Sequence, residues 1–148
     1  MKIEASPVYL DASALIKLYV PEVESNELED ALIGRTDIIV SELAVTEVAS
    51  ALARRLRQGE LEPSVAKRVY RRLLLDRDRE FRRVEVTAEV HREAERLLFT
   101  IGSSVPLRSA DSLHLALASL AQARAFVAYD RHLRAAVVAL GTLELPTR

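Results

Sequence analysis

The stretch VYLDASAL occupies residues 8–15, and in it a short apolar run ends at Asp11. Val8, Tyr9 and Leu10 are β-branched, aromatic or aliphatic residues that suit a buried strand. The small residues after Asp11 favour a helix. In open α/β sheets, ligands bind outside the carboxyl ends of the strands. The stretch therefore predicts an α/β fold, with Asp11 at the edge of the sheet where a ligand would bind.

The rest of the chain repeats this alternation of strands and helices. Apolar runs predict strands at 37–40, 83–86 and 125–129, and the tail at 142–145 is a candidate fifth strand. Helical spacing and capping residues predict helices at 12–20, 22–33, 42–58, 63–80, 87–101, 109–123 and 131–140. Such alternation is typical of a three-layer α/β/α fold with a mostly parallel central sheet, here of four or five strands. Two of the helices follow each other without a strand, so we expect a helical hairpin projecting from the sheet.

Length and composition narrow the class of protein. The chain has 148 residues, 49% of them hydrophobic, which predicts a single domain over 1–148. It has no cysteine, which excludes disulfides, thiolate zinc sites and cysteine nucleophiles. No apolar run approaches the ~20 residues of a membrane span, and no signal peptide is visible. We therefore expect a soluble, cytoplasmic protein. The net charge of −1 does not by itself predict nucleic-acid binding.

Two more aspartates occupy positions like that of Asp11. Asp130 follows the apolar run at 125–129, so it also lies at the carboxyl end of a predicted strand. Asp111 lies in the first turn of a helix that Ser109 is predicted to cap. An aspartate there can simply complement the partial positive charge of a helix N-terminus. Because this helix starts beside the same sheet edge, Asp111 is also a candidate for the site.

Glu47 is the fourth candidate, and the pattern leaves its role open. Ser41 is predicted to cap the helix that holds it. On that helix Glu47 lies opposite the apolar stripe that Val45 and Val48 begin, where a solvent-exposed glutamate would lie. Leu43, however, shares its side, which suggests that the start of this helix is covered on both faces.

The grouped acids point to a class of chemistry. Carboxylates without cysteines or a histidine cluster favour hard cations such as Mg²⁺ or Mn²⁺. A cation held by several acids lowers the pKa of a bound water and stabilises charge on a phosphodiester. Hydrolysis of phosphodiester bonds is the reaction that best suits a cation held by several carboxylates. A receiver domain would need a lysine near the end of a late strand, and no lysine follows Lys67. A haloacid-dehalogenase-type phosphatase would need an aspartate at position 13, which is serine.

Four motifs in the chain resemble those of PIN-domain proteins, especially VapC-type toxins. They are YLDASAL at 9–15, SELAVTEV at 41–48, RSADSLHLA at 108–116 and FVAYDRHL at 126–133. They occur in the order of the family and together span nearly the whole chain. The resemblance implies a site made of Asp11, Glu47, Asp111 and Asp130 as catalytic residues and metal ligands. It also implies that the hydroxyl of Ser13 orients these carboxylates.

The resemblance further implies a function and partners. A VapC-type protein is expected to be a metal-dependent endoribonuclease toxin that hydrolyses RNA, with Mg²⁺ or Mn²⁺ as cofactor. It is expected to form a homodimer, to be neutralised by a cognate VapB-like antitoxin, and to meet DNA only through that antitoxin. One departure concerns the fourth motif, where Ala128 replaces the usual threonine or serine. The alternative is therefore a catalytically weak PIN domain that acts mainly as an antitoxin-binding module in a DNA-bound regulatory complex.

A few other residues carry expectations that the structure can check. We expect Leu73 and Leu74 of the helical hairpin to contact the antitoxin. His114 is expected to be a hydrogen-bonded packing residue rather than a metal ligand. Lys17 could point towards the site from the first helix, but the favoured expectation is a surface lysine.

Overall fold

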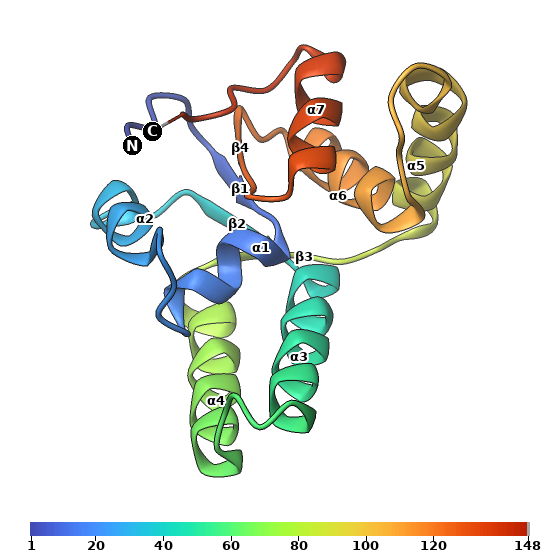
Figure 1. Ribbon diagram of the computed structural model, residues 1–148. Helices are drawn as coiled ribbons and strands as arrows, with labels where there is room; N and C mark the ends of the chain where they lie inside the picture. The colour runs from blue at the N-terminus through green and yellow to red at the C-terminus, as the bar shows by residue number, and fades with distance from the viewer. Residues whose placement is uncertain (148) are drawn as a thin grey trace.

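A four-stranded parallel sheet lies at the centre of the computed structural model, which describes residues 1–147 (Figure 1). The strands are β1 (Val8–Leu10), β2 (Ile38–Ser41), β3 (Arg82–Val84) and β4 (Ala125–Val127), in the order β3-β2-β1-β4. All three neighbouring pairs are parallel, which confirms the predicted α/β fold. The tail does not add a fifth strand, because it forms only an isolated bridge between Ala125 and Glu144.

Helices cover both faces of the sheet and complete the three layers (Figure 1). The α-helices and the two short 3-10 helices η1 and η2 are α1 (Ala12–Leu15), η1 (Ile16–Leu18), α2 (Ser25–Leu32), α3 (Glu42–Arg57), α4 (Pro63–Arg79), α5 (Ala88–Thr100), η2 (Ile101–Ser103), α6 (Ser109–Leu120) and α7 (Arg131–Leu140). Among residues 1–147, no helix combines the length and the apolar character needed to cross a membrane.

Alternation along the strands divides the core into two parts. Successive side chains of a strand point to opposite faces of the sheet. Val8 and Leu10 accordingly pack with α1 to α4, whereas Tyr9 packs with α5, α6 and α7. Ile39 of β2 and Phe126 of β4 lie on the same face as Tyr9. All five side chains are completely buried, so the sheet provides a rigid base for the residues at its edge.

The predicted helical hairpin is formed by α3 and α4, which extend away from the sheet side by side (Figure 1). Gly59 in the turn adopts a positive φ of 70°, which glycine tolerates without strain. Pro63 begins α4, where its missing N–H costs no hydrogen bond. Leu52 of α3 and Leu73 of α4 are buried in the core between the hairpin and the sheet.

One predicted cap is wrong, and the correction concerns the site. Ser109 was expected to cap α6, but it is the first residue of the helix, and Arg108 is the N-cap. The carboxylate of Asp111 accepts a hydrogen bond from the backbone N–H of Arg108 at 3.1 Å. Asp111 thus reaches back over the helix start and accepts the backbone N–H of the N-cap residue, as the acid of a capping box does.

Candidate active site

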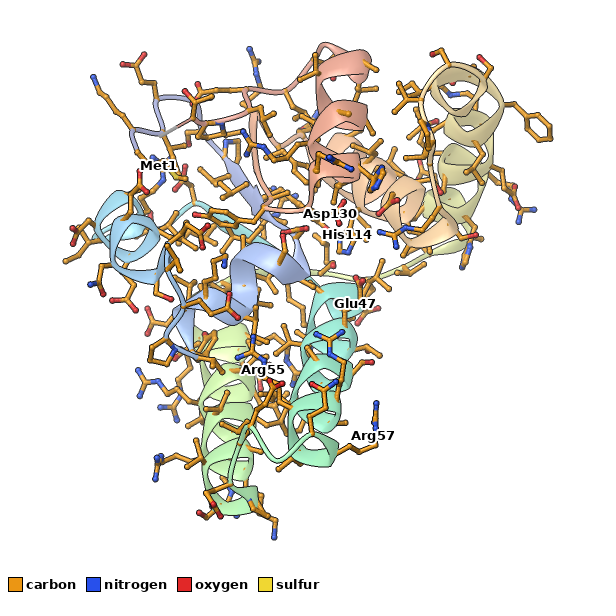
Figure 2. All side chains as sticks on the ribbon, in the orientation of Figure 1. Met1, Glu47, Arg55, Arg57, His114 and Asp130 are labelled. Carbon is orange, nitrogen blue, oxygen red and sulfur yellow. The ribbon has the colours of Figure 1, made fainter. Side chains whose placement is uncertain are left out.

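A pocket of about 470 Å³ lies at the carboxyl edge of the sheet, and its wall includes all four predicted acids: Asp11, Glu47, Asp111 and Asp130. The strand order explains why they meet. β1 lies between β2 and β4, so the chain leaves the sheet in opposite directions on either side of β1, and ligands bind at such switch points. Figure 2 shows Glu47 near the start of α3, close to His114 and Asp130.

Asp11 is the most deeply buried of the acids, with 4% of its surface exposed. It follows β1 and caps α1 by accepting a hydrogen bond from the N–H of Ala14 at 2.9 Å. Burial and, to a smaller extent, the nearby Glu47 carboxylate raise the pKa of this carboxyl to about 6, although hydrogen bonds from Ser13 and Ala14 act to lower it. The ionised form of Asp11 is therefore costly until another positive charge comes close.

Ser13 ties Asp11 to the loop that follows β4. Its hydroxyl donates to the Asp11 carboxylate, with oxygen–oxygen distances of 2.7 and 2.8 Å. The same oxygen accepts the backbone N–H of Tyr129 at 2.9 Å. Because Tyr129 directly precedes Asp130, this one hydroxyl sets the spacing between the two strand-end aspartates.

Glu47 is held by a chain of buried polar groups. One Glu47 oxygen forms a hydrogen bond with Nε2 of His114. Nδ1 of His114 lies 2.7 Å from the Tyr9 hydroxyl, which lies 3.1 Å from Oγ of Ser41. Ser41 Oγ in turn accepts the N–H of Ala44 at 3.0 Å and so caps α3. His114 is 2% exposed and uses both ring nitrogens, so the expectation of a hydrogen-bonded packing histidine is confirmed.

Arg108 lies between the remaining two acids. Its Nε is 3.2 Å from the Asp111 carboxylate, and its Nη2 is 3.8 Å from that of Asp130. Asp111 is 5% exposed, whereas the side chain of Asp130 is 37% exposed. Asp130 also caps α7 by accepting the N–H of Leu133 at 2.8 Å. Ala128 is buried and has no hydroxyl to offer, so Asp130 is oriented by this cap instead.

Lys17 contradicts the prediction of a surface lysine. It is 8% exposed and lines the pocket. Its ammonium group lies 2.5 Å from a Glu22 oxygen, 2.8 Å from a Glu24 oxygen and 4.8 Å from the centre of the Tyr129 ring. Two carboxylates and an aromatic face compensate for the loss of water around the charge. These partners come from loops whose approach a sequence pattern does not reveal.

The donor chemistry of the pocket fits a hard divalent cation. The four acids offer only carboxylate oxygens, and both nitrogens of His114 are already engaged, which favours Mg²⁺ or Mn²⁺. Within residues 1–147, however, no three such side chains already lie close enough together to share an ion. Glu47 is turned to His114 and Asp111 to Arg108. An incoming cation would compete with Arg108 for the Asp111 carboxylate, whereas the bond from His114 engages only one of the two Glu47 oxygens.

Several residues of the pocket wall were not singled out as site residues in the sequence. Arg54, Arg55 and Arg108 line it together with the acids. The spacing of Glu47, Arg54 and Arg55 is a signal that could have found them, because residues seven and eight positions apart share one face of a helix. Tyr9 could have been noticed as a phenol inside an apolar strand, where its hydroxyl needs a buried partner.

The fold and the pocket together define a class of proteins: three-layer α/β/α domains with a carboxylate site at the switch point of a parallel sheet. The family model of the PIN domain matches residues 8–138. The chain is 36% identical over 137 residues to ribonuclease VapC35 of Mycobacterium tuberculosis, covering 90% of this chain and 91% of that protein. The chain therefore belongs to the PIN-domain family, and its resemblance to VapC-type proteins is confirmed.

Solved structures agree on the fold. VapC20 of Mycobacterium tuberculosis, a Sarcin-Ricin loop cleaving toxin, has a TM-score of 0.70 at 16% identity, covering 88% of this chain and 95% of that one. FitAcB from Neisseria gonorrhoeae has a TM-score of 0.71 at 15% identity, with coverages of 94% and 96%. VapBC2 from Rickettsia felis, solved with a promoter DNA fragment, has a TM-score of 0.66 at 12% identity. The match covers 95% of this chain and 98% of that one.

Proposed function

We propose that this protein is an endoribonuclease toxin that hydrolyses RNA phosphodiester bonds and is neutralised by a small antitoxin. The observation that carries the proposal is the pocket lined by Asp11, Glu47, Asp111 and Asp130. It occurs in a chain that shares 36% identity, over 90% of its length, with a ribonuclease. The proposed place of action is the cytoplasm, where RNA and a newly made antitoxin are both present. A homodimer stays a prediction.

Each carboxylate has a separate part in the proposed mechanism. Asp11 and Asp111 are the proposed main ligands of Mg²⁺ or Mn²⁺, with Glu47 completing the site and Asp130 in an outer position. The ion would lower the pKa of a bound water and stabilise charge on the phosphodiester. Ser13 keeps Asp11 oriented, and His114 keeps Glu47 oriented. The orientation of these groups is set before substrate binds, which reduces the cost of reaching the reactive geometry.

The first prediction tests the metal and the acids together. We expect the purified protein to cleave single-stranded RNA with Mn²⁺ or Mg²⁺, and to lose cleavage in EDTA. We expect Asp111→Asn to lower the rate by roughly 100-fold or more, because a neutral amide is a poor ligand for a hard cation. The readout is gel analysis of a labelled RNA over time.

Asp78→Asn is a suitable control for that experiment. Asp78 lies on α4, is paired with Arg77 at 2.9 Å, and is not part of the pocket wall. We expect it to leave the rate unchanged. Equal cleavage by wild type with metal, wild type in EDTA and Asp111→Asn would contradict a metal-dependent nuclease.

The second candidate function is a catalytically weak PIN domain that mainly binds its antitoxin and, through it, DNA. Ala128 keeps this alternative open, because it leaves Asp130 without the hydroxyl usual in this motif, but the similarity to a ribonuclease supports the first function. The same RNA assay separates the two functions. Absence of cleavage of every RNA tested, together with tight antitoxin binding, would favour the binding function.

The helical hairpin offers a better-defined surface for the proposed antitoxin than the sequence suggested. Leu73 was expected to contact it but is completely buried in the core, so truncating it would test folding instead. An apolar groove lies instead between the outer sides of α3 and α4. Its wall is formed by Ala49, Leu52, Ala53, Leu56, Pro63, Ala66, Lys67 and Tyr70. Leu56 and Tyr70 are 37% and 39% exposed there.

Leu56→Asp is expected to weaken antitoxin binding by at least tenfold, because it places a charge in an apolar contact. Leu75→Asp is the matched control: Leu75 is also on the hairpin and is 47% exposed, but it does not line the groove. We expect it to change the affinity by less than about twofold. Surface plasmon resonance with the immobilised antitoxin measures both. Equal effects of the two substitutions would exclude the groove as the binding surface.

A further inference from the structure

The side of α3 that faces the pocket changes its charge along its length. Glu47, near the start of the helix, belongs to the acidic site. Ala51, one turn further along the helix, also lines the pocket and carries no charge. Arg54 and Arg55, two turns beyond Glu47, also line the pocket. The pocket therefore has an acidic end at the sheet and a basic end on the hairpin.

The two arginines of the basic end differ in their partners. Arg55 forms an ion pair with Glu22, which also binds Lys17, so its charge is already neutralised within the protein. Arg54 is exposed and, among residues 1–147, forms neither a hydrogen bond nor an ion pair with another side chain. An arginine that lines a pocket without an acidic partner keeps its full capacity to bind an anion from solution.

The position of Arg54 matches a phosphate beyond the acidic site. Seven residues of α-helix separate it from Glu47, which corresponds to a rise of about 10 Å on one face of the helix. A strand of RNA placed with one phosphodiester at the acids would continue along the pocket and bring a neighbouring phosphate to the guanidinium. The guanidinium presents paired N–H donors that suit phosphate oxygens.

We propose that Arg54 binds a backbone phosphate of the RNA next to the cleaved bond and thereby positions the substrate strand along α3. The inference rests on the proposed ribonuclease function and adds a direction to it, since the RNA would run from the sheet edge towards the hairpin turn. Contacts to phosphates position a nucleic acid without reading its sequence. Arg54 would therefore strengthen binding of all substrates alike.

Arg54→Ala and Arg57→Ala form a matched pair. Arg57 is also an exposed arginine of α3 that pairs with no acid among residues 1–147, but it lies outside the pocket wall. Figure 2 shows it near the end of α3, at the opposite end of the helix from Glu47. We expect Arg54→Ala to raise KM for a single-stranded RNA by about tenfold with little change in kcat. Arg57→Ala should leave both constants within about twofold, and Arg54→Lys should restore part of the loss.

Salt dependence supplies a readout that a general loss of stability would not move. A fluorescein-labelled RNA oligonucleotide containing a site that the wild type cleaves is titrated with Asp11→Asn protein, so that it stays intact. In the Asp11→Asn background, the further substitution Arg54→Ala should reduce the slope of log affinity against log salt concentration by about 0.7. This is the value for the loss of one contact to a single-strand phosphate. Adding Arg57→Ala should leave the slope unchanged.

The outcomes separate this inference from the proposed function. If the wild type cleaves RNA and both alanine variants behave alike, the role of Arg54 is wrong and the nuclease function stands. If Arg54→Ala weakens only antitoxin binding, the arginine serves the protein partner and this inference is overturned. If the wild type cleaves no RNA with either metal, the proposed function and this inference fail together.

Discussion

Asp11→Asn should lower the rate of RNA cleavage by roughly 100- to 1000-fold and, in the same molecule, make the metal-free protein more stable at neutral pH. The loss of activity follows from replacing a proposed metal ligand by a neutral amide. The gain in stability follows from burial, since Asp11 is 4% exposed and no cationic group among residues 1–147 forms an ion pair with its carboxylate. An asparagine can keep the capping bond from the N–H of Ala14.

The pH dependence of this gain has a definite sign. The folded-state pKa of Asp11 is about 6, raised from 3.8. Well below the unfolded-state pKa of 3.8, the carboxyl is protonated in both the folded and the unfolded chain, so it costs no stability. As the pH rises towards 6, the unfolded chain ionises first, and above 6 the full penalty is present. A shift of about two units corresponds to roughly 3 kcal/mol in the free energy of unfolding.

Thermal unfolding in EDTA at pH 4, 5, 6 and 7.5 measures the difference in stability between Asp11→Asn and wild type. We expect the stabilities of Asp11→Asn and wild type to differ only slightly at pH 4 and to differ most at pH 7.5. Asp37→Asn is a control of opposite sign, because Arg35 lowers the pKa of Asp37 by binding it at 2.7 Å. That variant should be less stable than wild type at pH 7.5. Equal melting temperatures of Asp11→Asn and wild type at pH 7.5 would refute the penalty.

His114→Phe should weaken Mn²⁺ binding by about 10- to 100-fold, the usual cost of removing a residue that orients a ligand. His114 touches no substrate in the proposed mechanism; it acts by holding Glu47 towards the pocket. Without it, the Glu47 side chain is free to turn into solvent. The substitution also removes a partner from the buried Tyr9 hydroxyl, which should lower stability by about 1–3 kcal/mol. Calorimetric titration with Mn²⁺ and urea unfolding measure the two effects.

The double substitution Tyr9→Phe with His114→Phe separates positioning from stability. It replaces both partners of the buried hydrogen bond by apolar rings of similar shape, which is often nearly neutral for stability. We expect it to regain most of the stability but none of the affinity for Mn²⁺. Wild-type affinity in His114→Phe, or its return in the double variant, would show that Glu47 needs no such support.

The sequence predicted the parts of the fold and site that depend on local order. Asp11 and Asp130 were recognisable because each follows a short apolar strand, and parallel strands end at a common edge. The hairpin followed from two helical patterns without an intervening strand. Glu47 could not be decided from its helix alone. Its place in the pocket depends on α6, which brings His114 against α3 from 67 positions away in the chain.

The remaining features depend on contacts between distant segments, which a local pattern does not contain. Lys17 resembled a surface lysine because its compensating partners include the ring of Tyr129, more than a hundred residues later. The expected Ser109 cap is a local exception: Arg108 is the N-cap, and the Asp111 carboxylate accepts its backbone N–H three residues away. Burial of Leu73 depends on how α4 packs against α3 and the sheet.

α3 contributes to the wall of the pocket and to the wall of the outer groove, and none of its residues belongs to both. Glu47, Ala51 and Arg54 belong to the pocket, whereas the neighbouring positions 49, 53 and 56 belong to the outer groove. The two sets interleave along a single helix, so each can vary in a library while the other is held constant. Under the proposed roles of the groove and of Arg54, partner preference and substrate handling would be independent traits encoded in the same sixteen residues. A gene duplicate could acquire a new neutralising partner and keep its chemistry, which lets such pairs become insulated from one another within one cell.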